Sequence, residues 1–268
     1  MKVFSERIEF AKEITKRAGL KIKELRTGDV VTISKGRNDL LTIADGISEK
    51  MIVEAIIKTF PDDSIIGEEN GETKRGTSEY TWVIDPLDGT INYSHNLPFY
   101  GVSVGIMKDK LPYGGAIYLP MFDELYCCER GKGAFCNDIK LSVSKCAELK
   151  DAYCTYGYSN RDVTKREYAD KTYENLMHNS MNSLSFLCAT FSFANVAKGN
   201  FDCYVSIGMY LWDLCVGAVL VEEAGGKWST PDGKDLDYSS YKCEYVGFAT
   251  NSNIHDEVVS IMQDIKLS

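Results

Sequence analysis

Two carboxylates stand three residues apart in the stretch TWVIDPLDGTINY, which covers residues 81–93. The apolar run WVID is typical of a buried strand, so Asp85 should lie at the end of an internal strand. Pro86 keeps Asp85 extended and lacks a backbone donor. The chain can then turn at Leu87, so that Asp88 faces the same way as Asp85. We therefore expect two carboxylates on one tight turn.

The residues after this turn can bind an anion, and two further stretches add acids. Gly89 permits close backbone approach, and its N–H and that of Thr90 can point into the same space. The stretch IIGEEN contributes Glu68, and LWDLCVG contributes Asp213. Each pattern has a simple structural explanation when it is taken singly. Asp85 to Gly89 can be an ordinary turn, Glu68 can lie on a solvated surface, and Asp213 can be a helix N-cap. Together they predict one acidic site.

Converging carboxylates need a cation. Without one they repel each other and raise each other's pKa values. Magnesium takes oxygen ligands and bridges carboxylates to phosphate. A metal ion would also turn an acidic pocket into an electrophilic one, so the pattern favours Mg²⁺-dependent chemistry on a phosphate ester.

Hydrophobic spacing predicts the elements that position these residues. Residues 4–25 are expected to form an amphipathic helix. A second helix should follow Asp45 and continue to Phe60, with Ile47, Met51, Ala55 and Ile56 on its apolar face. Short strands between residues 81 and 143 predict an antiparallel meander. Beyond residue 152, strands alternate with helices expected at 164–178, 184–198, 211–226 and 253–265. We expect one domain, 1–268, with an internal seam near 144–150.

Composition excludes several classes of function. The 268 residues are 44% hydrophobic and carry a formal net charge of −9. This charge repels the phosphates of nucleic acids and anionic lipids, so we expect neither as a partner. The chain has no run of 18 apolar residues that predicts a membrane span. The charged beginning MKVFSERIEFAKE lacks the apolar core of a signal peptide.

The cysteines indicate the compartment. There are nine, an odd number that cannot all pair within the chain, and no C-x-x-C motif occurs. With three histidines, a structural zinc site is not expected. The pattern predicts reduced thiols in a cytoplasmic protein.

Five pieces of the chain, in order, resemble the inositol monophosphatase superfamily of Mg²⁺-dependent, lithium-sensitive phosphatases. They are IGEE at 66–69, WVIDPLDGTINY at 82–93, HNLPFYGVSVG at 95–105, GKGAFCN at 131–137 and WDLCVGAVLVEEAGG at 212–226. The resemblance covers about 250 residues. It implies a mixed αβ fold layered as an αβαβα sandwich, a homodimer, and hydrolysis of a small phosphomonoester such as inositol monophosphate or a related sugar or polyol phosphate.

The resemblance also implies roles for individual residues. Two or three Mg²⁺ ions would be held by Glu68, Asp85, the Leu87 carbonyl, Asp88 and Asp213. Thr90 would orient the attacking water together with Glu68, and Asp45 would support Thr90. The substrate-binding residues would be Asp88, Gly89, Thr90, Cys188, Ala189, Ser206 and Asp213.

The sequence departs from the family pattern where the alcohol would bind. The family's stretch arginine-serine-x-glycine-serine/threonine-alanine-alanine corresponds here to LSFLCAT, residues 184–190, which lacks both the arginine and the glycine. The glutamate that hydrogen-bonds to sugar hydroxyls in the inositol enzymes aligns with Ser206. A buried helix start is the alternative explanation of LSFLCAT.

Other functions remain open at this point. The motif DPLDGT is similar to the D-x-D-G-T motif of haloacid dehalogenase enzymes, which use the first aspartate as a covalent nucleophile. A catalytically inactive metal-binding scaffold is the non-enzymatic alternative. Within the superfamily, phosphatases for histidinol phosphate, fructose 1,6-bisphosphate and adenosine 3′,5′-bisphosphate are alternatives.

Overall fold

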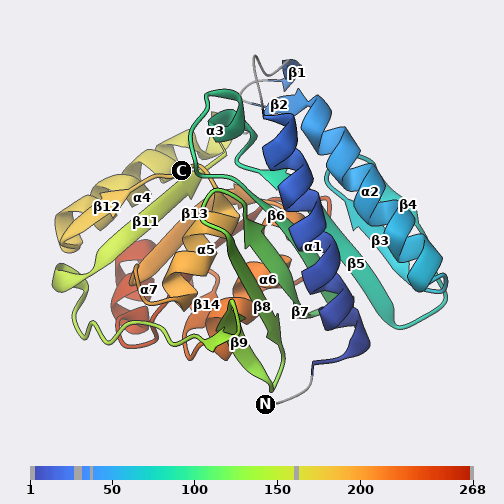
Figure 1. Cartoon of the computed structure of the whole chain (residues 1–268). Coiled ribbons are helices and arrows are strands. Elements are labelled where there is room, and N and C mark those ends of the chain that lie inside the picture. Colours follow the sequence, from blue (N-terminus) through green and yellow to red (C-terminus); the bar gives the residue numbers. More distant parts are fainter. Residues whose placement is uncertain (1–3, 27–31, 37–38, 160–162, 266–268) are drawn as a thin grey trace.

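The fold is a five-layer sandwich. The computed structural model describes residues 4–26, 32–36, 39–159 and 163–265. Helices and sheets alternate across the molecule, as Figure 1 shows. The outer helical layer holds α1 (Glu6–Leu25) and α2 (Ile43–Thr59), the central one α5 (Ala189–Ala197) and α6 (Leu211–Glu223), and the far one α4 (Arg166–Asn179) and α7 (His255–Gln263). The expected αβαβα architecture is confirmed.

The first sheet has eight strands in the order β10-β9-β8-β7-β6-β5-β3-β4. All neighbouring strands pair antiparallel except β3 and β5, which are parallel. The predicted meander is therefore present. The strands are β3 (Ser64–Gly67), β4 (Gly71–Lys74), β5 (Tyr80–Asp88), β6 (Gly101–Lys108), β7 (Leu111–Leu119), β8 (Glu124–Glu129), β9 (Gly133–Cys136) and β10 (Ile139–Lys140).

The second sheet has five strands in the order β12-β11-β13-β15-β14, with both parallel and antiparallel pairs. Its strands are β11 (Tyr153–Tyr158), β12 (Asn182–Leu184), β13 (Cys203–Met209), β14 (Lys227–Ser229) and β15 (Tyr245–Thr250). Residues 141–152 connect the two sheets. The strands β1 (Thr32–Gly36) and β2 (Asp39–Thr42) form a separate hairpin, and α3 (Thr90–Ser94) is a short helix after β5.

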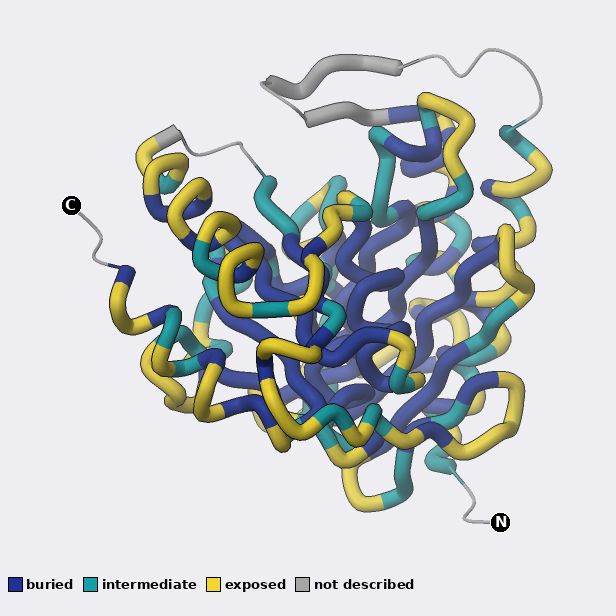
Figure 2. Tube along the Cα trace, turned by 90° about the vertical axis from the view of Figure 1, so that its left-hand side faces the viewer, coloured by how far each residue is buried: buried dark blue, intermediate teal, exposed yellow. Residues whose placement is uncertain are grey.

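Apolar side chains fill the spaces between the layers. One cluster packs α1 and α2 on the first sheet, a second surrounds α5 and α6 between the sheets, and a third packs α4 and α7 on the second sheet. The buried parts of the chain accordingly run through the middle of the molecule in Figure 2. Within the described ranges, no helix combines the length and the apolar character needed to cross a bilayer. All nine cysteines are free thiols.

The predicted apolar face of α2 is confirmed in part: Ile56 is buried and Met51 and Ala55 pack against the core, but Ile47 does not. Ile47 is 36% exposed, whereas Asp45, Ser48 and Glu49 are buried together with Ile52. The helix begins at Ile43, and Thr42 caps it in a capping box with Asp45. The inward face carries polar groups because they hydrogen-bond to the turns of the neighbouring sheet, which local hydrophobic spacing does not reveal.

A buried ion pair joins α1 to the strands that lead to the acids. Asp63 is fully buried just before β3. Its carboxylate accepts two hydrogen bonds from Arg7, at 2.8 and 2.9 Å, and one from Trp82 Nε1 on β5, at 2.9 Å. Burial alone would raise the pKa of Asp63, but the hydrogen bonds from Arg7, Ser78 and Trp82 outweigh it and lower the pKa.

We predict that Asp63→Asn destabilises the fold by about 3 kcal/mol at pH 7, because it leaves the Arg7 guanidinium without its counter-charge. A lowered pKa stabilises the fold above the unfolded-state value and loses that effect as pH falls through the folded-state value. The difference between the two proteins should therefore shrink in acid. Urea unfolding measures it, with the exposed pair partner Glu72→Gln as control, which should change little.

Candidate functional site

A β-bulge, rather than a turn, brings the first two acids together. In the pairing of β5 with β6, Asp85 lies opposite Ser103 and Asp88 opposite Gly101, so β5 has one residue more than its partner. Residues three apart on a regular strand point to opposite faces of the sheet. The extra residue reverses this alternation, so Asp85 and Asp88 share a face. The expected tight turn is corrected accordingly.

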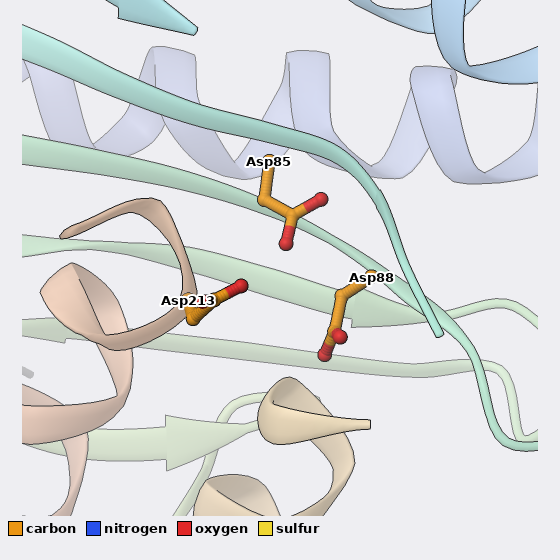
Figure 3. Close-up of side chains that lie close together, drawn as sticks. All are labelled: Asp85, Asp88 and Asp213. Atoms are coloured by element: carbon orange, nitrogen blue, oxygen red, sulfur yellow. The ribbon is translucent and has the colours of Figure 1, made fainter. Parts of the chain in front are cut away.

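The third acid arrives from the central helical layer. One oxygen each of Asp85, Asp88 and Asp213 lies within 4.8 Å of the others, and the three side chains point toward one another in Figure 3. Asp213 is the third residue of α6, and its carboxylate accepts the Tyr210 N–H at 2.6 Å. The N-cap is thus Tyr210. The expectation that Asp213 itself caps the helix is wrong by three residues.

Glu68 stands on the turn after β3, beside these acids. Its N–H donates to the Ile84 carbonyl of β5 at 3.0 Å. The turn is held from behind by Glu49 of α2, whose carboxylate accepts the Glu69 N–H at 3.0 Å. A Cβ on Gly67 would lie 2.6 Å from that carboxylate, so a side chain there would displace the Glu49 carboxylate. Sequence analysis missed Glu49, because a glutamate inside a helical pattern is normally solvated.

Asp88 is bound to the start of α5, about one hundred residues later. Its Oδ2 accepts the Thr190 N–H at 2.6 Å and the Thr190 hydroxyl at 2.7 Å, and the Cys188 thiol lies 3.2 Å away. The helix begins at Ala189, so the predicted start at residue 184 is wrong. Leu187 has a left-handed backbone, with φ of +50°, that a helix cannot include. Sequence analysis did not single out Thr190, because its partner is distant in sequence.

Thr90 lies between the bulge and α2. Its hydroxyl is 3.0 Å from the Leu87 carbonyl and 3.4 Å from Asp45 Oδ1. Ser48, one turn along α2, donates to the Pro86 carbonyl at 2.8 Å. The polar face of α2 therefore contacts the bulge itself as well as the turn that bears Glu68.

Gly89 is the N-cap of α3 and has φ of +82°. A Cβ there would lie 2.6 Å from the Phe99 carbonyl. Both the conformation and the close approach require glycine. The backbone of Gly89 and Thr90 consequently reaches the wall of the site without an intervening side chain.

These residues line one pocket of about 140 Å³. Every residue that sequence analysis assigned to the site is in its wall except Asp45, which lies behind Thr90 and contacts it. Ser206, 3% exposed on β13, and Cys188 and Ala189 at the start of α5 are part of this wall. The two sheets and α5, α6 and β5 thus all contribute to the same cavity.

The pocket is strongly acidic. Burial is the largest cause that raises the pKa of Asp85 well above its usual value, and the charges of Glu68, Asp88 and Asp213 add to it. No lysine, arginine or histidine is among the described residues of the wall. Asp85 Oδ2 is buried and accepts no hydrogen bond from any described residue. An oxygen-lined site with one unsatisfied carboxylate oxygen fits a hard cation such as Mg²⁺.

Comparison with known proteins identifies the family. The model of the inositol monophosphatase family matches residues 4–267. The chain belongs to the inositol monophosphatase family. It is 36% identical over 231 residues to a fructose-1,6-bisphosphatase/inositol-1-monophosphatase of Aquifex aeolicus, covering 85% of this chain and 83% of that one. It is 35% identical over 201 residues, 75% of each chain, to the Nus factor SuhB of Pasteurella multocida.

Solved structures agree with this assignment. The inositol monophosphatase of Anabaena superposes with a TM-score of 0.83 at 31% identity, covering 97% of this chain and 96% of that one. The family match over nearly the whole chain leaves no place for the haloacid dehalogenase alternative. The name of the Aquifex relative supports phosphatase activity in the family, whereas the name of the Pasteurella relative mentions no substrate and leaves the exact role open.

We predict that Asp85→Asn leaves the metal-free protein at least as stable as the unsubstituted chain. An acid whose pKa rises on folding destabilises the folded state at any pH where it is ionised. The melting temperature without divalent ions should therefore rise, by about 2–4 °C for each kcal/mol of repulsion relieved.

The stabilisation that Mg²⁺ confers on the unsubstituted protein should be lost in the same variant, since asparagine lacks one carboxylate oxygen and the negative charge. Differential scanning calorimetry with and without Mg²⁺ measures both effects, with the exposed Asp62→Asn as control. A metal-free variant that melts well below the unsubstituted protein would show that ionised Asp85 stabilises the fold.

Proposed function

We propose that the protein hydrolyses small phosphomonoesters with the help of two or three Mg²⁺ ions. Glu68, Asp85, the Leu87 carbonyl, Asp88 and Asp213 would hold the ions. Two observations carry the proposal: one oxygen each of three carboxylates lies within 4.8 Å of the others, and a buried oxygen of Asp85 has no donor among the described residues. An inactive scaffold is disfavoured because Thr90 and Glu68, which could position and deprotonate a water, line the same pocket as these acids.

Bound Mg²⁺ would supply Lewis-acid activation of water and neutralise the charge of the leaving oxygen. The chain's own residues would position the reactants. The Thr90 hydroxyl has one proton, which it can donate either to the Leu87 carbonyl or to Asp45. Donation leaves a lone pair of Thr90 Oγ1 free to accept a hydrogen bond from the attacking water. The Glu68 carboxylate would accept the proton that this water loses.

The phosphate would lie against the backbone of Gly89 and Thr90, which forms the wall nearest the bulge. N–H groups from Gly89 and Thr90 would bind its oxygens, and Cys188 and Ala189 line the same pocket. The thiol of Cys188 is buried, and burial and the neighbouring Asp88 raise its pKa, so it would stay protonated and act as a neutral contact. Hydrolysis then proceeds by direct attack of water, without a covalent enzyme intermediate.

The alcohol end of the pocket would be weakly selective among sugar and polyol phosphates. Ser206 occupies the position at which the inositol enzymes have a glutamate. A serine side chain is too short to hydrogen-bond to the sugar hydroxyls that this glutamate binds. Histidinol phosphate, fructose 1,6-bisphosphate and adenosine 3′,5′-bisphosphate are the alternative substrates on this fold. We propose that inositol 1-phosphate is accepted without being strongly favoured.

We also propose a cytoplasmic homodimer. The nine free thiols support a reducing compartment. Met121 and Phe122 follow β7 and are each 42% exposed, and the ring of Phe122 stacks with that of Phe99. These exposed apolar side chains suit a contact with a second copy of the chain. Sedimentation of the full chain at micromolar concentration measures the mass; a monomer would argue against the dimer.

We predict that Thr90→Ala lowers kcat by roughly 10²–10⁴-fold, the usual contribution of a positioned acid–base group. Thr90→Ser should keep most of the rate, because it retains the hydroxyl. The Mg²⁺ concentration for half-maximal activity should change little in both variants.

Phosphate release from a panel of phosphomonoesters, with Mg²⁺ and with excess chelator, measures these effects and tests the proposed function. Full activity in chelator would refute the metal-dependent mechanism. If Thr90→Ala leaves kcat unchanged, the hydroxyl of Thr90 has only a structural role.

We predict that Ser206→Glu raises kcat/KM for inositol 1-phosphate relative to a simple alkyl phosphate by about tenfold or more. One hydrogen bond to a charged group contributes about 1.5–3 kcal/mol. Ser206→Gln is the matched control, since it has the same length without the charge, and it should give a smaller gain. If the unsubstituted protein already prefers inositol 1-phosphate by several orders of magnitude, or if glutamate changes nothing, residue 206 does not contact the alcohol.

A further inference from the structure

A second cavity, which we call the tyrosine groove, continues from the acidic pocket. It has a volume of about 460 Å³ and is lined by Ile91, Tyr156, Tyr158, Ser159, Ala169, Asp170, Tyr173, Ser185 and Leu187. Four of these residues also line the acidic pocket: Ile91, Tyr158, Ser159 and Leu187. The two cavities therefore share part of their walls, and the groove is the larger of the two.

Leu187 marks the junction of the two cavities. Its φ of +50° is a conformation in which glycine is favoured and a branched side chain is strained. Its side chain is nevertheless 49% exposed, so it does not serve the hydrophobic core. Strained residues persist mainly where their side chains have a function. An exposed leucine in this conformation supplies an apolar contact between the acidic pocket and the groove.

The groove combines aromatic rings with a carboxylate. The rings of Tyr156 on β11 and Tyr173 on α4 lie 5.5 Å apart at an angle of 48°. The Tyr156 hydroxyl donates to the Ala169 carbonyl at 2.9 Å, which fixes its ring. Tyr173 is 40% exposed, so its ring is accessible from the groove.

The carboxylate is that of Asp170, next to Ala169 on α4. Asp170 is exposed and has no ion-pair partner among the described residues. No lysine or arginine in those ranges lines the groove. A second phosphate would be repelled by this arrangement, whereas a cation would be attracted both by the carboxylate and by the tyrosine rings.

We propose that the tyrosine groove binds the alcohol part of the substrate and prefers an alcohol that carries a positively charged ammonium group. This inference rests on the proposed function, because it assigns the far end of the same substrate. The acidic pocket would hold the phosphate and the metal ions. The ammonium group would lie among Tyr156, Tyr158 and Tyr173 near Asp170, with Leu187 against the linking carbons.

Two esters of the same shape test the charge preference. Phosphocholine has a quaternary ammonium group, and 3,3-dimethylbutyl phosphate has a neutral carbon in its place. The ratio of their kcat/KM values cancels changes in phosphate and metal binding. Comparing this ratio between variants also cancels the different reactivity of the two leaving groups.

We predict a ratio of about ten in favour of phosphocholine in the unsubstituted protein, as expected for combined cation–π and partly screened charge interactions. Asp170→Asn and Tyr173→Leu should each lower the ratio by about threefold, whereas Tyr173→Phe should keep it. Glu174→Gln removes a neighbouring exposed charge of α4 outside the groove and should leave the ratio unchanged.

The outcome separates this inference from the proposed function. If both esters are hydrolysed and neither Asp170→Asn nor Tyr173→Leu changes the ratio, the groove does not bind the cation and only the subsite assignment fails. If no phosphomonoester of the panel is hydrolysed, the proposed function fails. Calorimetric binding of the two esters then decides the subsite: equal affinities overturn it, and tighter binding of phosphocholine that Asp170→Asn weakens supports it.

Discussion

The carboxylate of Asp85 is the constraint around which the rest of the molecule is arranged. It is buried, three other acids raise its pKa, and one of its oxygens has no donor among the described residues. Such a cluster opposes folding unless the surrounding structure holds it in place. The five-layer packing provides this support, because strands and helices from both sheets reach the cluster with apolar contacts behind them. A cation would remove the remaining repulsion.

The acids are held by hydrogen bonds from outside their own elements. Helix α2 contacts the bulge through Ser48 and the Glu68 turn through Glu49. Helix α5 holds Asp88 through Thr190, and α6 holds Asp213 by its own capping box. Each contact restricts the rotation of a carboxylate or of the backbone that carries it. This rigidity matters for phosphate ester hydrolysis, in which positioning and charge stabilisation contribute most of the catalysis.

The two ends of the site differ in chemical character. At the acidic end, the carboxylate oxygens are held on rigid backbone. Gly89 allows the backbone itself to form part of the pocket wall there. The other end contains tyrosines, one exposed carboxylate and a leucine in a strained conformation. In the proposed function, the first end would bind the metal ions and the phosphate, and the second would bind the far part of the alcohol. Ser206 lines the acidic pocket without being one of its acids, so a change there can alter substrate preference without removing a carboxylate.

The sequence by itself determined the layered αβ class, the antiparallel meander and the set of acids, because these follow from local hydrophobic spacing and from several motifs in a fixed order. It also placed Asp85 at the end of a buried strand. Only the tertiary structure decided that a bulge puts Asp85 and Asp88 on one face, because the extra residue is defined by the pairing with β6. Three further features could not be predicted from the sequence either: the inward polar face of α2, the start of α5 at Ala189, and the contact of Thr190 with Asp88. Each depends on a partner 20 to 102 residues away, and no local pattern encodes a partner at that distance.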